Sequence, residues 1–146
     1  DAKNTMLLAS FYAGVAITAS GTTAVHALSY PLGGKYHIAH GVSNAILLAP
    51  VMRFNEPACR PLLAKAYDRC LKGEARTEEE KSAAVIARLE AIVKHLDIPT
   101  SLTGFGVPKE DLEALVASGM EVTRLLVNNM RKVTADDARK IYQEVL

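Results

Sequence analysis

The first third of the chain is almost continuously apolar, whereas charged residues crowd the remainder. Met6–Leu28 is a stretch of 23 residues without a formal charge. Small residues recur through it, and they let neighbouring helices approach closely. This pattern predicts a helix that is buried on most sides within a larger helical body.

Proline and glycine residues divide the apolar region. Ser29–Gly34 contains one proline and a pair of glycines, which predicts a loop after the first helix. Gly41–Met52 has a broad apolar face and predicts a second buried helix. Pro57 and Pro61 bracket the expected start of the next helix.

Helix signals continue to the end of the chain. Thr77 stands three residues before Glu80, which is the spacing of a capping box. Further starts are expected near Pro108 and Thr134, where acidic residues follow in the first turn. Apolar residues at helical spacing follow the capping box: Val85, Leu89, Ile92 and Leu96. No segment alternates with period two. The sequence therefore predicts an all-α, bundle-like domain of about six helices.

The long apolar stretch also has to be weighed as a membrane segment. It is long enough to span a bilayer. Serine, threonine and histidine side chains interrupt it, and basic clusters and aromatic belts do not flank it. The start of the chain has neither the basic segment nor the initiator methionine of a signal peptide. We therefore expect no membrane partner and a cytoplasmic location.

Composition and charge exclude other classes. The 146 residues are 49% hydrophobic and 23% charged, which suits one globular domain and excludes a disordered chain. The formal net charge is +1, so no general attraction to nucleic acid is expected. The two cysteines, Cys59 and Cys70, cannot form a disulfide framework, and we expect both to be small buried hydrophobic residues.

Histidines concentrate where the first two predicted helices meet. His26 falls near the end of the first helix and His40 at the start of the second, and the loop between them could bring both imidazoles together. A metal-binding imidazole must be neutral, and burial in an apolar helix favours the neutral form. His37 could join His40 at a spacing of three residues. His95 is expected at the surface.

Carboxylates are missing from this candidate metal site. No Asp or Glu occurs between Lys3 and Asn55. A catalytic metal needs three or more protein ligands, often including a carboxylate. The missing ligands are therefore expected outside this chain or far along it. The abrupt apolar start after Asp1 agrees with a chain that lacks upstream residues. The alternative is a metal-free helical interaction module in which the histidines are structural.

Several motifs together resemble a known family. His26–Gly34, His40–Pro50 and Phe54-Asn55 are similar to the C-terminal helical region of the iron-containing (group III) alcohol dehydrogenases. The tail Asn128–Arg131 resembles the family's ending, except that Met130 stands where proline is usual. The resemblance covers nearly the whole chain.

This resemblance implies an architecture and a metal. Residues 1–146 would be the C-terminal, all-helical metal-binding domain of a dehydroquinate synthase-like enzyme. The N-terminal α/β domain, which binds NAD or NADP, would be absent. The family holds Fe²⁺, or sometimes Zn²⁺, with one aspartate and three histidines, and two of those histidines match His26 and His40.

The resemblance also implies roles around the metal. The enzyme would interconvert an alcohol and an aldehyde or ketone, and it could form a homo-oligomer. Many members have a histidine where this chain has Tyr30, which would border the substrate. Ile17 matches a position in the substrate pocket, and His40 would also lie near the nicotinamide. The isolated piece would be inactive. A related oxidoreductase, such as a maleylacetate reductase, is an alternative.

Overall fold

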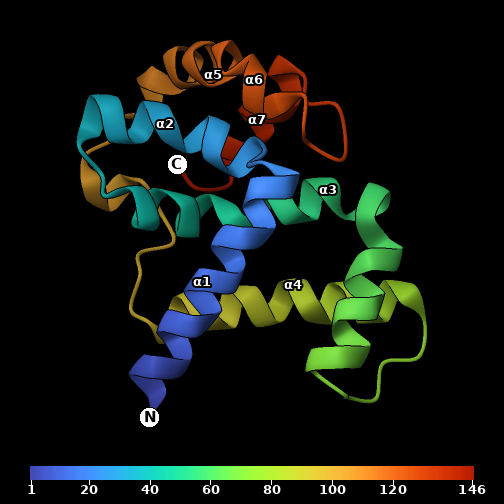
Figure 1. The fold of residues 1–146 in the computed structure, drawn as a ribbon. Coiled ribbons are helices and arrows are strands. Elements are labelled where there is room, and N and C mark those ends of the chain that lie inside the picture. Colours follow the sequence, from blue (N-terminus) through green and yellow to red (C-terminus); the bar gives the residue numbers. More distant parts are fainter.

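The computed structural model describes residues 1–146 and contains helices but no strands. The predicted all-α class is thus confirmed. Figure 1 shows α2 and the C-terminal helices stacked on one side of α3, with α4 on the other side. The α-helices are α1 (Ala2–Ser20), α2 (Ala24–Tyr36), α3 (His40–Cys70), α4 (Glu78–His95), α5 (Leu112–Glu121), α6 (Thr123–Leu126) and α7 (Ala135–Gln143), with short 3₁₀ turns at Thr103–Phe105 and Lys109–Asp111.

The main hydrophobic core lies between α2, α3, α5 and α7. Tyr142 is fully buried at its centre, and its hydroxyl donates a 2.5 Å hydrogen bond to the carbonyl of Leu28. Burial raises the pKa of this hydroxyl, so Tyr142 stays a donor at neutral pH. Other core residues are Leu32, Ile46, Leu47, Val51, Leu102, Leu115, Val116 and Ile141.

The prediction of a loop at Ser29–Gly34 is wrong, because these residues lie within a helix. The chain breaks earlier, at Gly21, whose φ of 69° ends α1 because only glycine adopts this conformation readily. α2 then runs through Pro31 to Tyr36. Pro31 has no N–H to donate to the preceding turn, but the core packing of this helix outweighs that loss.

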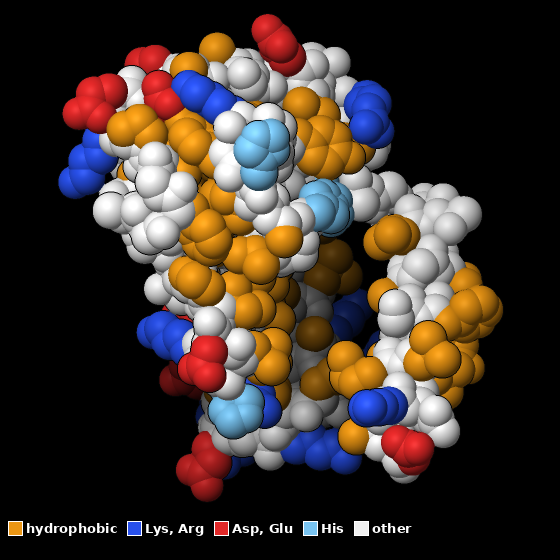
Figure 2. All heavy atoms as spheres, turned by 90° about the vertical axis from the view of Figure 1, so that its left-hand side faces the viewer, with side chains coloured by type: hydrophobic (Ala, Val, Ile, Leu, Met, Phe, Trp, Pro, Cys, Tyr) orange, Lys and Arg blue, Asp and Glu red, His pale blue; other side chains and the backbone are white.

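α1 leaves the rest of the molecule at this break. The helix has no buried residue, so the prediction of a first helix buried on most sides is wrong for these 146 residues. Met6, Leu7 and Phe11 are each more than 60% exposed. Figure 2 shows hydrophobic side chains along α1, which projects at the right of the view, and a hollow between α1 and the other helices. The cause is the bend of 107° between α1 and α2, which directs α1 away from the core helices.

No single helix combines the length and hydropathy needed to cross a bilayer. α1 and α2 meet the criterion only when taken together, across their bend.

Prolines in the middle of the chain also behave differently from expectation. Pro57 and Pro61 do not mark a new start, since both lie inside the continuous helix α3. A proline can bend a helix without ending it, and α3 changes direction along its length in Figure 1. Cys59 is buried as predicted, but Cys70 is exposed because it falls in the outward-facing last turn.

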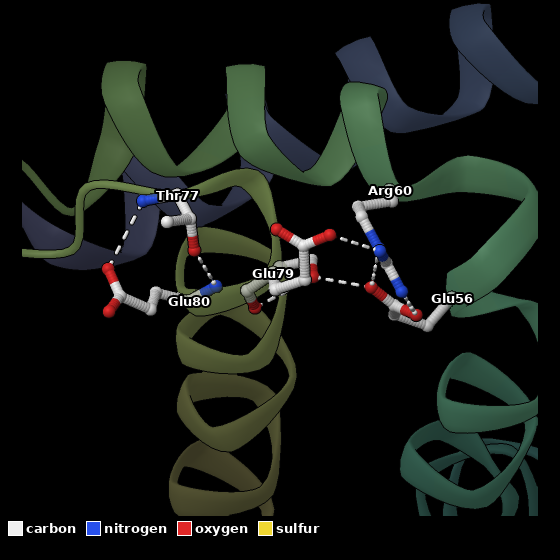
Figure 3. A network of polar contacts seen from close by, with 6 residues as sticks. Glu56, Arg60, Thr77, Glu79 and Glu80 are labelled. Atoms are coloured by element: carbon white, nitrogen blue, oxygen red, sulfur yellow. Dashed lines mark hydrogen bonds and ion pairs between the residues drawn. The ribbon is translucent and has the colours of Figure 1, made fainter.

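A polar network fastens the second half of α3 to the start of α4 (Figure 3). The predicted capping box of Thr77 and Glu80 is present. Arg60 donates to Glu56 at 2.7 Å and also pairs with Glu79, while the Ser82 hydroxyl donates to Glu56 at 2.6 Å. These donors hold the pKa of Glu56 below its usual range, with Arg60 the larger cause. The carboxylate therefore stabilises the fold at neutral pH and loses that effect in acid.

α5 packs closely on α2 at Gly119. A Cβ at Gly119 would lie 2.8 Å from the side chain of Leu28 and 3.2 Å from the Tyr142 hydroxyl. Gly119→Ala should lower the free energy of unfolding by about 1–3 kcal/mol, because the core cannot admit the methyl group without moving. Gly34→Ala is the matched control, since a Cβ on this helical residue would meet nothing within 4 Å. It should raise stability by roughly 0.5–1 kcal/mol. The measurement is urea unfolding of both variants. An equal change in the free energy of unfolding would contradict close packing of Gly119 against Leu28 and Tyr142.

Candidate metal centre

His26 lies in the first turn of α2, not at the end of a helix as predicted. Gly21 ends α1, and α2 begins afresh at Ala24. His26 is therefore the third helical residue, on the turn that faces the bend between the two helices. The Ser29 hydroxyl donates to the His26 carbonyl at 2.9 Å and helps to order this turn.

The chain returns along α2 before α3 begins. His37 adopts the left-handed conformation at the end of α2, with φ 55°. The Ile38 N–H then donates to the Leu32 carbonyl at 3.4 Å, which folds the chain back onto the helix. His40 starts α3, as predicted, and lies beside the earlier turns of α2. His37 and His40 do not lie on the same helix, so the prediction that they share a helical face is wrong.

This return brings the two predicted histidines together. The ring centroids of His26 and His40 lie 5.2 Å apart, although 14 positions separate the residues in the sequence. Burial lowers the pKa of His26, and the nearby charge of His40 adds to that effect. His26 is thus held in the neutral form, which has the free lone pair that a metal ligand needs.

Asn44 contributes a polar group that sequence analysis did not assign. Its side-chain nitrogen lies 2.9 Å from Nε2 of His40, one helical turn earlier. Its carbonyl oxygen is buried and has no hydrogen-bond partner. The spacing of four residues on one helix is the signal that could have identified this pair. Asn44 fixes the orientation of the His40 ring.

The two other predicted site residues lie nearby. The Tyr30 ring is 6.0 Å from that of His40, and the Arg124 guanidinium lies 5.9 Å from the Tyr30 ring. Ile17 is 51% exposed and lines a hollow at the bend between α1 and α2. The hollow is also lined by Gly21, Thr22, Thr23, Val25, His26, Gly41, Asn44, Ala45, Leu48 and Met52.

The donor set fits part of a metal site. The His26 imidazole lines the hollow and the His40 imidazole lies close to it, and nitrogen donors of this kind suit Fe²⁺ and Zn²⁺. No group of three or more His, Cys, Asp or Glu side chains is arranged so that it could hold a metal ion. The carboxylate shortage seen in the sequence is thus also present in space, and residues 1–146 bring together two imidazoles where a catalytic metal needs three or more protein ligands.

Comparison with known proteins places this geometry in context. The model of the family described as "Fe-containing alcohol dehydrogenase family, C-terminal" matches residues 1–146. Long-chain-alcohol dehydrogenase 1 of Geobacillus thermodenitrificans is 38% identical over 145 residues, which is 98% of this chain and 36% of the relative. Lactaldehyde reductase of Escherichia coli K12 is 33% identical over 143 residues, 97% of this chain and 37% of the relative. The chain thus spans about a third of their length.

Solved structures share the fold. An alcohol dehydrogenase from Oenococcus oeni superposes with a TM-score of 0.80 at 27% identity, covering 92% of this chain and 35% of that one. A 1,3-propanediol oxidoreductase superposes with a TM-score of 0.77 at 27% identity, covering 85% of this chain and 32% of that one.

The contact between the histidines can be tested in the metal-free protein. His40→Ala should raise the pKa of His26 part of the way toward its ordinary value, because the charge of His40 is removed while burial remains. The measurement is an NMR titration of the His26 ring, with His95→Ala, at the exposed end of α4, as the control. Since the folded state disfavours protonated His26, stability should also fall as the pH drops below about 6.5. An unchanged His26 titration in His40→Ala would contradict the observed ring contact.

Proposed function

Because the chain belongs to the iron-containing alcohol dehydrogenase family, we propose that it supplies half of the metal site of an NAD(P)-linked alcohol dehydrogenase. The observation that carries this proposal is the 5.2 Å approach of the His26 and His40 rings. The reaction would be hydride exchange between a nicotinamide and an alcohol, giving an aldehyde or ketone.

His26 and His40 would hold Fe²⁺ or Zn²⁺ through one nitrogen each. When bound, the metal supplies Lewis-acid polarisation of the substrate oxygen. The burial that keeps His26 neutral prevents a proton from competing for the same lone pair. An aspartate and a third histidine, together with the nucleotide-binding domain, would come from the part of the relatives' length that residues 1–146 do not span. Residues 1–146 alone should therefore be inactive.

Tyr30 and Ile17 would contact the substrate. Tyr30 is 38% exposed beside His40, so its hydroxyl can donate a hydrogen bond to a substrate oxygen. Tyrosine is a weak proton relay near neutral pH, in contrast to a histidine at this position. Ile17 would present an apolar side chain to the carbon skeleton of the alcohol. His40, which is exposed, would also lie near the nicotinamide.

A metal-free interaction module is the second candidate. The exposed hydrophobic residues of α1 favour it, because such a helix suits a partner surface. In that case the two histidines would serve only the fold. A maleylacetate reductase of the same family would use the same metal site on a different substrate.

Metal analysis of the full-length protein that carries this chain separates these candidates. The parent should contain stoichiometric iron or zinc. The double variant His26→Ala/His40→Ala should lose at least about 100-fold in metal affinity, because loss of two ligands costs more than the 10–100-fold typical of an outer hydrogen-bond partner. Dehydrogenase activity should disappear with the metal. His95→Ala is the control and should keep both.

Retention of metal and activity in the double variant would refute the proposed site. A parent that folds without any metal would favour the interaction module.

A further inference from the structure

The C-terminal tail segment Asn128–Arg131 lies against the start of α2, more than 90 residues away in the sequence. The Asn128 side chain donates to the Thr22 carbonyl at 3.3 Å. The Ala24 N–H donates to the side-chain oxygen of Asn129 at 3.5 Å. The tail therefore contacts the bend between α1 and α2 on the turn that carries His26.

Asn129 acts as a helix cap supplied from a distant part of the chain. Thr23 occupies the usual capping position of α2, but its side chain makes no capping hydrogen bond. The first N–H groups of a helix have no partner within the helix, and a side-chain oxygen normally satisfies one of them. For Ala24, which is fully buried, that oxygen comes from Asn129.

A reciprocal amide pair extends this cap to α3. Asn55 donates to the Asn129 oxygen at 3.0 Å, and Asn129 donates back to the Asn55 oxygen at 2.7 Å. Asn129 also donates to the Arg131 carbonyl at 2.6 Å. Asn55 is only 5% exposed and Asn129 is half-buried, so loss of the Asn129 amide would leave the buried amide of Asn55 without these partners. We call Asn55 and Asn129 the amide pair.

The surroundings hold the amide pair in place. Arg131 donates to the Phe54 carbonyl at 2.9 Å, and its guanidinium lies 4.2 Å from the centre of the Phe54 ring. A Cβ at Gly21 would lie 2.7 Å from the Asn128 amide, so the tail and the bend are in close contact. The tail, α2 and α3 thus meet in one hydrogen-bonded junction.

We propose that the amide pair is a positioning device for the metal site, an inference that rests on the proposed function. α2 carries His26 and α3 carries His40; the amide pair joins α3 to the tail, and the Ala24 N–H joins the tail to α2. Asn129 also fixes Ala24, two residues before His26. Loss of the pair would free the first turn of α2, so that His26 no longer lies at a fixed distance from His40. Neither asparagine is among the proposed metal ligands or substrate-contacting residues.

The test compares two lost helix caps in the full-length protein. Asn129→Leu keeps the branched shape and the number of side-chain heavy atoms and removes every hydrogen bond of the amide. Thr134→Ala removes the cap of α7, where the Thr134 oxygen accepts from the Asp137 N–H at 3.2 Å. Both variants should unfold at lower temperature than the parent. Only Asn129→Leu should lose metal affinity, by about 10-fold, as expected for an outer partner of a ligand. Zn²⁺ is the probe, titrated in competition with a chelator.

A second readout does not depend on metal. Amide hydrogen exchange in the first turn of α2, including the Ala27 N–H that donates to Thr23 at 3.1 Å, should be faster in metal-free Asn129→Leu and unchanged in Thr134→Ala. If the parent binds no Zn²⁺, the proposed function fails, while this exchange result still tests the junction. If Asn129→Leu does not fold, Asn129→Ala replaces it and should lose Zn²⁺ affinity in the same way, with Asn129→Asp as the matched control. Asn129→Asp keeps the acceptor for Ala24, so it should lose stability but retain Zn²⁺ affinity within about twofold.

Two results would overturn the proposal. One is an Asn129→Leu protein that binds Zn²⁺ as tightly as the parent and exchanges its α2 amides at the parent rate. The other is an equal loss of affinity in Thr134→Ala, which would show that general destabilisation explains the effect.

Discussion

The junction at the start of α2 is the constraint on which the candidate site depends. Gly21 ends α1, Asn129 satisfies the Ala24 N–H, and His26 follows within the same turn. Helix starts are free to fray unless something accepts their hydrogen bonds. The position of one imidazole therefore depends on a side chain from the last fifth of the sequence, while the position of the other depends on the return of the chain at His37 and Ile38.

The sequence predicts the class of fold and the pair of histidines well. Apolar residues at helical spacing and the Thr77–Glu80 capping box are local signals, and both correspond to helices in the structure. The approach of His26 to His40 was expected for the correct residues but for the wrong reason. A loop at Ser29–Gly34 was expected to bring them together, whereas a helix with a left-handed end does so.

What the sequence does not predict depends on distant contacts. Pro31 is read as a helix breaker because its ring removes a hydrogen bond, yet burial of Leu28 and Leu32 in the core holds α2 helical. The exposure of α1 also depends on distant contacts. Its apolar residues would suit a buried helix if another helix packed against them. Asn55 and Asn129 have no spacing signal at all, because 74 positions separate them. Their partnership exists only in the folded chain.

The tail contact also has a consequence for the order of assembly. Ala24 and the amide that caps it are 105 positions apart, so this hydrogen bond cannot form until Asn129 has been synthesised. During synthesis on the ribosome, the helix that bears the first imidazole emerges long before its cap. A chain truncated before Asn128 would contain all residues of α2 and α3. It would lack the tail side chains that hold these two helices together. Ordering of this junction therefore waits for a side chain that is synthesised 105 positions after the helix start that it caps.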